Sequence, residues 1–248
     1  MKFGYMLTVA AALLASAACT SEKNNSAPAS SSGETIKVDP PQDGDWSKIV
    51  NQTAEGGFLM GNPQAQAKLI EIGALTCSHC RDFDEQGVPS LIEKYVKTGK
   101  VSWEFRPYLL SGLDVPANLI VRCNGPQAFF PLARALYKDQ PEWIARIGAA
   151  PPEQVERIQN LPPQQQFAEL AKLADLQTWA AARGVPRAKS DQCLRDQKTA
   201  EALVQQTSDV QAQYPKFQGT PTFILNGEML EISATWPNLE PELKKALQ

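Results

Sequence analysis

The chain has 248 residues, 43% of them hydrophobic, with 24 basic and 27 acidic side chains, five cysteines and one histidine. A formal net charge of −3 argues against the basic surface that nucleic-acid binding needs. A single histidine excludes multi-histidine metal sites and HExxH zinc proteases. Five cysteines are too few for a disulfide scaffold, so any cysteine chemistry is local.

Residues 1–18 predict a secretion signal, with Lys2 as the positive start, an apolar run and small residues at the end. The run is shorter than the ~20 apolar residues that span a bilayer. Cys19 follows at once, and residues 16–19 resemble the lipobox of bacterial lipoproteins, although Ser16 stands where Leu is usual. Lipidation at Cys19 and ordinary signal cleavage remain alternatives. Both take the protein to a compartment where disulfides persist, which we expect to be the periplasm.

Residues 19–45 are rich in Ser, Asn, Pro and Gly and predict a flexible tether, because they offer too little apolar surface to offset their ordering entropy. The folded part is predicted to begin near Trp46. Residues 57–61 are a short strand candidate that ends at a Gly-Asn-Pro turn signal. Residues 68–75 form a nearly continuous apolar run, as expected for a central strand buried on both faces.

The motif Cys77-Ser78-His79-Cys80 follows this strand directly. Residues 101–106 alternate apolar and polar side chains and predict the next strand, so the motif is placed at the strand-to-helix junction of a β-α-β unit. A helix N-terminus carries about half a positive charge and stabilises a thiolate on the first cysteine. We therefore assign Cys77 as the attacking nucleophile and Cys80 as the resolving thiol. The ring of His79 is expected to face the thiolate and lower its pKa further.

Three other functions of a C-x-x-C motif compete with a redox pair. A structural zinc site needs two more ligands, and only Cys123 and Cys193 remain in the body of the chain, far apart. A c-type haem needs His directly after the second cysteine, where this chain has Arg81. A purely structural disulfide across so short a loop adds little stability. A redox pair is favoured, and it requires neither a metal nor a bound cofactor.

Residues 113–213 predict helices and contain no convincing strand. Apolar side chains lie on one face over residues 126–139. A longer helix is predicted over residues 163–182, with Pro in its first turn and Gly184 after its end. About a hundred helical residues thus separate two blocks of strand.

The second block of strands contains the sequence Asn226-Gly227 between two apolar runs, residues 222–225 and 229–232. Asn-Gly in this position predicts a β-hairpin. Thr220-Pro221 stands just before the hairpin, where an ordinary trans turn is the usual interpretation. Residues 237–247 predict a last amphipathic helix.

Together these features resemble the DsbA-type thiol-disulfide oxidoreductases of the thioredoxin superfamily. The resemblance covers residues 57–247 and rests on the Cys77–Cys80 motif, on Glu71 in the strand before it, and on the Thr220-Pro221 loop. It implies an α/β thioredoxin fold with an inserted all-helical domain. The implied segments are a signal peptide at 1–18, the tether at 19–45, thioredoxin parts at 46–112 and 214–248, and the helical insertion at 113–213.

The resemblance also implies roles for individual residues. In the family a cis-proline packs against the cysteine pair, so Pro221 would shape the substrate groove and Thr220 would bind the substrate main chain. Family oxidases usually carry proline where this chain has Ser78, a departure at a position expected to contact substrate. Glu71 would assist proton transfer, the alternative being a strand residue capped by solvent.

Cys123 lies in a segment that resembles the helical domain of a DsbA subgroup. In that subgroup such a cysteine pairs with one in an Asp-x-Cys-Leu segment, here residues 191–194. The resemblance therefore implies a structural disulfide between Cys123 and Cys193, with two free buried cysteines as the alternative. Closing a loop of ~70 residues would stabilise the fold by roughly 4 kcal/mol in the chain-entropy model.

Three functions are consistent with these features of the sequence. The first is a monomeric protein thiol oxidase that acts on reduced exported proteins and is reoxidised by a membrane quinone-linked thiol oxidase. The second is a disulfide isomerase or reductase. Superfamily isomerases tend to be dimers with an N-terminal dimerisation domain, for which residues 20–45 are too polar, whereas the Thr before Pro221 favours such relatives. The third is a non-catalytic peptide-binding protein on the same scaffold.

Overall fold

The computed structural model describes residues 39–248. The predicted signal peptide, Cys19 and most of the predicted tether lie outside the described residues. All the described residues belong to one compact unit. The boundaries of the five predicted segments stay predictions.

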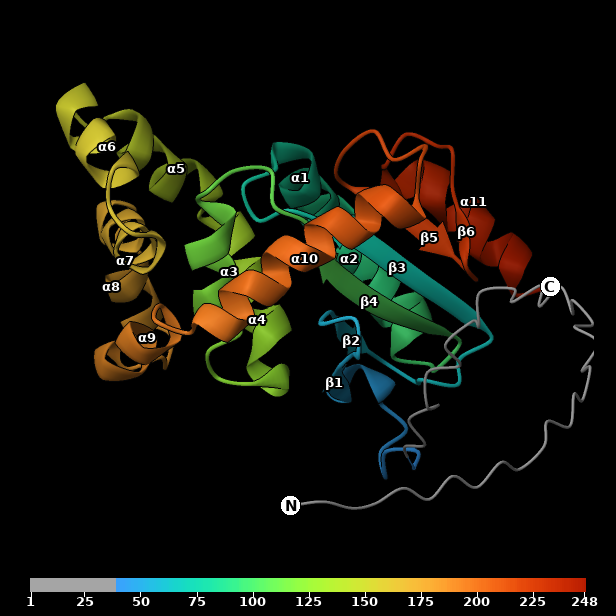
Figure 1. Ribbon diagram of the computed structural model, residues 1–248. Coiled ribbons are helices and arrows are strands. Elements are labelled where there is room, and N and C mark those ends of the chain that lie inside the picture. The colour runs from blue at the N-terminus through green and yellow to red at the C-terminus, as the bar shows by residue number, and fades with distance from the viewer. Residues whose placement is uncertain (1–38) are drawn as a thin grey trace, which may run out of the picture. The chain divides into compact units, whose positions relative to one another are not determined.

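A six-stranded mixed sheet organises this unit, with strand order β1-β2-β4-β3-β5-β6 (Figure 1). The strands are β1 (Val50–Gln52), β2 (Phe58–Met60), β3 (Ala67–Gly73), β4 (Val101–Pro107), β5 (Thr222–Leu225) and β6 (Glu228–Met229). The central strand β3 pairs in parallel with β4 and antiparallel with β5. The strand predicted over residues 68–75 is therefore confirmed as the centre of the sheet, and the sheet is that of a thioredoxin-like α/β fold.

The helices fall into three groups along the chain. A short 3₁₀ turn, η1 (Trp46–Lys48), precedes β1. Between β3 and β4 lie α1 (Ser78–Gln86), α2 (Val88–Leu91) and η2 (Ile92–Val96). Between β4 and β5 lie α3 (Asp114–Val121), α4 (Pro126–Lys138), α5 (Gln140–Gly148), α6 (Pro152–Gln159), α7 (Pro163–Leu173), α8 (Leu176–Ala181), α9 (Arg187–Cys193) and α10 (Gln197–Gln213). The last helix, α11 (Trp236–Ala246), follows the hairpin as predicted.

The helical insertion is joined to the sheet by aromatic side chains of α4. Phe129 stacks on Phe58 of β2 with ring centroids 3.8 Å apart, and Phe130 packs against Trp103 of β4 at 4.6 Å. Such pairs add about 0.5–1.5 kcal/mol each beyond the burial of their area. The insertion and the sheet consequently share one hydrophobic core.

The strand predicted over residues 101–106 is confirmed as β4, and it is buried over its whole length, its polar side chains included. Glu104 and Arg106 form a bidentate ion pair with N–O distances of 3.0 and 3.1 Å. Thr53 donates a third hydrogen bond to Glu104 at 3.0 Å. Helix α10 packs against β4, so these polar groups are satisfied by each other rather than by water (Figure 1).

The helix predicted over residues 163–182 is broken in the structure. Asp175 adopts a left-handed conformation with φ of 57°, and it separates α7 from α8. Both segments pack on α3, and beyond that shared neighbour α7 contacts α5 and α6 whereas α8 contacts α9. Ala171 and Leu176, on either side of the break, are both fully buried.

The predicted hairpin is confirmed, with Asn226 at φ of 51° and Gly227 at 89°. These positive φ values are those of a two-residue type I′ turn. The second strand is shorter than predicted, because the chain leaves the sheet after Met229. Residues 230–233 instead line a cavity beside Pro221. Within residues 39–248, no helix has the length and apolar character needed to cross a membrane.

Candidate functional site

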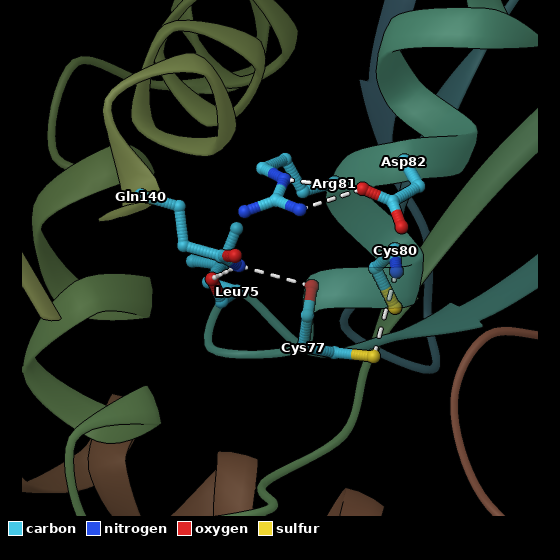
Figure 2. A network of polar contacts seen from close by, with 6 residues as sticks. All are labelled: Leu75, Cys77, Cys80, Arg81, Asp82 and Gln140. Atoms are coloured by element: carbon cyan, nitrogen blue, oxygen red, sulfur yellow. Dashed lines mark hydrogen bonds and ion pairs between the residues drawn. The ribbon is translucent and has the colours of Figure 1, made fainter. Parts of the chain in front are cut away.

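The cysteine pair lies at the junction between β3 and α1, as predicted. Cys77 has extended backbone angles and is the N-cap of α1, and its Sγ accepts a hydrogen bond from the Cys80 N–H at 3.4 Å (Figure 2). Both cysteines are thiols in this structure. Cys80 is completely buried, whereas Cys77 retains 8% exposure. Cys77 is therefore the sulfur that a second protein could reach.

The surroundings of the two sulfurs drive their pKa values apart. Hydrogen bonding from the Cys80 thiol, and then from the Thr220 side chain and the backbone N–H groups of Cys80 and His79, lowers the pKa of Cys77 from 9.0 to about 5 against the opposing effect of burial. Burial raises the pKa of Cys80 well above its usual value. At neutral pH the reduced pair is a thiolate on Cys77 beside a thiol on Cys80.

His79 lies between the two cysteines in the first turn of α1. Ser78 and His79 are both exposed, and the ring makes no hydrogen bond to Cys77 among the residues described. His79 acts on Cys77 through its backbone N–H. Its side chain lines a cavity of about 440 Å³ together with Pro221 and Trp236.

The loop before β5 brings Thr220 and Pro221 to the cysteine pair. The Thr220–Pro221 peptide bond is cis, as the resemblance implies. The Cys77 Sγ lies 3.2 Å from the carbonyl oxygen of Thr220, to which it donates a hydrogen bond when it is protonated. The side-chain hydroxyl of Thr220 is buried and helps to lower the pKa of Cys77. The two segments, 143 residues apart in sequence, thus form one site.

Two buried side chains hold the turn that carries Cys77, and the sequence pattern alone missed both. Gln140 from α5 donates to the carbonyl oxygens of Leu75 at 2.8 Å and Cys77 at 2.9 Å (Figure 2). Asp114 from α3 accepts from the N–H of Thr76 at 2.9 Å and from its hydroxyl at 2.8 Å. Both supports come from the helical insertion, so the insertion fixes the backbone on which the nucleophile sits.

Asp114 also accepts hydrogen bonds from the backbone N–H groups of Leu110 at 3.0 Å and Ser111 at 2.9 Å. One carboxylate therefore ties the loop after β4 to the turn before α1. An acidic residue preceding an apolar helical run is a recognisable helix-start signal. What that signal cannot reveal is the contact with Thr76, because it joins two loops that are distant in sequence.

Glu71 of β3 is buried beneath the cysteine pair, with only 2% exposure. Its Oε2 accepts a hydrogen bond from Trp103 Nε1 at 3.1 Å, so the alternative of a strand residue capped by solvent is wrong. Burial, and next the nearby charge of Asp84, raise the pKa of Glu71 to about 8. Asp84 is itself paired with Arg134 at 3.1 Å, and burial raises its pKa to about 6. Glu71 therefore holds a proton at neutral pH.

The other two cysteines of the described region, Cys123 and Cys193, form a disulfide. The pairing implied by the resemblance is confirmed, and the alternative of two free cysteines is wrong. Among residues 39–248 no cluster of three or more His, Cys, Asp or Glu side chains has the arrangement of a metal site.

Comparisons with known proteins agree with this arrangement. The thioredoxin family model matches residues 53–245. The chain is 30% identical to a protein-disulfide isomerase of Novosphingobium aromaticivorans, with a TM-score of 0.73 over 77% of this chain and 96% of that one. The fold is also that of alpha-DsbA1 of Wolbachia pipientis, at 22% identity and a TM-score of 0.61, covering 76% of this chain and 89% of that one.

Among curated relatives, a Rickettsia felis protein described as a "Putative protein-disulfide oxidoreductase" is 26% identical over 208 residues. The match covers 81% of this chain and 66% of that protein, so the chain spans about two thirds of the length of this relative. The family model and the Novosphingobium structure each cover most of the chain. The chain therefore belongs to the thioredoxin family, with a DsbA-like fold and a disulfide in its helical insertion.

Proposed function

We propose that the protein is a thiol-disulfide oxidoreductase that introduces disulfides into exported proteins. The observation that carries this proposal is the asymmetry of the cysteine pair, in which the pKa of Cys77 is about 5 and that of Cys80 is far above its usual value. A stable thiolate stabilises the reduced form of the enzyme. A stable reduced form makes the Cys77–Cys80 disulfide a strong oxidant.

The reaction begins with the oxidised enzyme, in which Cys77 and Cys80 share a disulfide. A substrate thiolate attacks Sγ of Cys77, a mixed disulfide forms, and Cys80 leaves and takes up a proton. A second substrate thiolate then attacks the substrate sulfur of the mixed disulfide, and Cys77 leaves as a thiolate. The substrate loses two electrons and its two thiol protons. One proton ends on Cys80 and the other goes to solvent, because Cys77 stays ionised.

Glu71 is the proposed proton carrier for Cys80. It is buried, it is protonated at neutral pH because its pKa is about 8, and its carboxylate, when ionised, raises the pKa of the nearby Cys80. A protonated carboxyl group at this place can supply the proton that the leaving Cys80 sulfur needs. Solvent has no direct route to Cys80, which is completely buried.

The proposed substrate groove is the 440 Å³ cavity beside Pro221, whose lining includes His79 and Trp236. We assign Thr220 the binding of the substrate main chain, Pro221 the shape of the groove, and Ser78 a contact with the substrate. These roles rest on the position of all three residues beside the Cys77 sulfur.

The cellular setting is part of the same proposal. Reduced exported proteins are the substrates, and a membrane quinone-linked thiol oxidase returns the pair to the disulfide. The protein would act in the periplasm as a monomer, with residues 1–18 as the signal and Cys19 as the residue that carries a lipid anchor. The five segment boundaries of the sequence interpretation belong to this proposal as well.

The test is the equilibrium of the Cys77–Cys80 pair with glutathione, measured in a Cys123→Ala/Cys193→Ala variant so that a single dithiol titrates. We expect a potential clearly more oxidising than the approximately −270 mV of thioredoxin, together with oxidation of a reduced, unfolded model substrate. The same double variant with Cys77→Ser is the control and should oxidise nothing. A potential at or below about −270 mV would contradict the oxidase and support a reductase.

Disulfide isomerisation is the second candidate, and two observations favour it. Threonine precedes the cis-proline at position 220, and the Novosphingobium relative carries the name protein-disulfide isomerase. An isomerase would reactivate a substrate with scrambled disulfides faster than it oxidises a reduced one. A non-catalytic peptide-binding protein, in contrast, would keep its cellular function when Cys77 is changed to Ser.

A further inference from the structure

The groove beside Pro221 is lined by an acidic side chain that the proposed reaction does not use. Asp82 of α1 lines this 440 Å³ cavity together with His79 and Trp236. Residues 79, 82, 83 and 86 all line it and recur at the spacing of one helix face, so this face of α1 forms a wall of the groove. Among the described residues that line the cavity, Asp82 is the one acid, and none is Lys or Arg.

The carboxylate of Asp82 is only half engaged by the protein. Its Oδ1 accepts hydrogen bonds from Nε and Nη2 of Arg81, at 3.2 and 2.7 Å, whereas Oδ2 accepts none within residues 39–248 (Figure 2). The Asp82 side chain is 43% exposed, so the carboxylate stays open to water and to a second donor. Arg81 lines a different cavity and not the groove.

The nearest charged groups outside this wall are paired among themselves. A second cavity, of about 600 Å³, adjoins the groove across the cis-proline loop. The two charged residues that line it, Lys216 and Glu231, form an ion pair at 2.5 Å. Lys94, whose Nζ lies 6.0 Å from the centroid of the Trp236 ring, pairs with Glu240 at 3.2 Å. Neither pair therefore offsets the carboxylate in the groove.

The position of Asp82 on α1 indicates which substrate residue it meets. Cys77 is the N-cap of this helix, and Asp82 stands five residues later. Five residues advance about 7.5 Å along a helix axis. An extended peptide advances about 3.3 Å per residue. A substrate chain that runs along this wall from the Cys77 sulfur therefore brings to Asp82 the side chain two residues from its own cysteine.

We propose that the enzyme prefers substrates with a lysine or arginine two residues from the reacting cysteine, paired with the free Oδ2 of Asp82. This inference rests on the proposed function, because it concerns the mixed disulfide that forms at Cys77. A cationic side chain donates to a carboxylate oxygen, whereas an acidic side chain at the same place is repelled. An exposed pair contributes modestly, so Asp82 selects among substrates and leaves the sulfur chemistry unchanged.

The test is a competition between two peptides for Cys77 in the full chain carrying Cys80→Ser, which traps the mixed disulfide. Both are capped pentapeptides with a central cysteine between two glycines. One has lysine at both ends and the other glutamate, so the direction of the bound chain does not matter. Equimolar peptides equilibrate in a glutathione buffer at pH 8 and low salt. After an acid quench, mass spectrometry of the fragment that contains Cys77 gives the ratio of the lysine adduct to the glutamate adduct.

We expect this ratio to fall about fivefold when Asp82→Asn is added, because attraction of one peptide and repulsion of the other are both lost. Comparing the same two peptides on two variants cancels the difference between their own thiols. Salt at about 0.5 M should remove most of the fall, since it screens exposed charges. A fall that persists unchanged in salt would contradict the charge pairing.

Glu85→Gln is the matched control, because Glu85 is an exposed acid of the same helix that does not line the groove. It removes the same charge and should change the ratio by less than about twofold. Arg81→Gln removes the internal partner of Asp82 and should raise the ratio, and a lower ratio would count against the proposal. If Asp82→Asn changes the ratio no more than Glu85→Gln does, the preference alone is overturned. If neither peptide forms an adduct, the proposed thiol exchange at Cys77 is overturned with it.

Discussion

The Cys80 thiol is the largest single cause of the low pKa of Cys77. This attribution is tested by a pair of substitutions at one buried position. Cys80→Ser keeps a hydroxyl that can donate to the Cys77 thiolate, whereas Cys80→Ala removes the donor and little volume. We expect the pKa of Cys77 to stay within about one unit of its value in Cys80→Ser and to rise by more than one unit in Cys80→Ala.

The magnitude follows from the shift of Cys77 from 9.0 to about 5. Because pH 7 lies two units above this pKa, ionisation of Cys77 stabilises the reduced site by about 2.7 kcal/mol at that pH. A site with a pKa near 7, as in thioredoxin, gains about 0.4 kcal/mol. Because about 1.4 kcal/mol corresponds to 30 mV for a two-electron couple, the difference is about 50 mV. The wild-type potential should therefore lie near −220 mV or be more oxidising.

Thiolate absorbance between pH 3 and 10 measures the pKa of Cys77 in the Cys80 variants, and the rate of alkylation gives a second measurement. The wild-type potential should also fall by about 30 mV per pH unit between pH 5 and 9, because reduction takes up one proton there, and by about 59 mV below pH 5. If the pKa of Cys77 is the same in Cys80→Ala and Cys80→Ser, a hydrogen bond from position 80 is not what lowers it. The N-terminus of α1 would then have to supply the shift.

Three further predictions concern stability. The raised pKa of Glu71 means that the folded state binds the Glu71 proton more tightly than the unfolded state does. The free energy of unfolding therefore falls by up to about 1.4 kcal/mol per pH unit as pH rises from 4.5 to about 8. Chemical denaturation across this range should show that Glu71→Gln removes most of the fall, whereas equal slopes for the variant and the wild type would contradict the prediction. Asp114→Ala leaves the N–H and hydroxyl of Thr76 unpaired and should lower the free energy of unfolding by about 3 kcal/mol, with Asp114→Asn losing less. Replacing both Cys123 and Cys193 by Ala removes a disulfide between residues 70 apart in sequence and should lower the free energy of unfolding by about 4 kcal/mol, as measured by urea unfolding. An unchanged free energy of unfolding would mean that the unfolded chain is already constrained without the disulfide.

Local signals predicted the parts of the fold that depend on neighbours in sequence. The apolar run of β3 and the C-x-x-C motif placed Cys77 at the start of a helix, and the structure has it as the N-cap of α1. Asn226-Gly227 predicted the hairpin because only a few residue types accept positive φ at both turn positions. β1 escaped notice, since three residues at the edge of a sheet carry too little periodicity to identify.

The parts that could not be predicted depend on contacts between distant segments. The alternation in β4 predicted a strand but not what covers its polar side chains: α10 packs against β4, and Glu104 and Arg106 pair with each other. The helix over residues 163–182 has good helical propensity throughout, and tertiary packing breaks it at Asp175. In both cases the decisive partner lies on another helix of the insertion, which no local pattern identifies.

The same division applies to the chemistry of the site. The N-cap position of Cys77 is a local property, and by itself it would lower the pKa of any cysteine placed there. The asymmetry with Cys80 is not local, because it needs Cys80 and Glu71 to be buried in the folded core and Thr220 to approach from the far end of the chain. Gln140 then holds the Cys77 carbonyl from the insertion. A thioredoxin sheet without the insertion would keep the motif but lose the hydrogen bonds that hold the backbone of Cys77, so the insertion is part of the proposed active site.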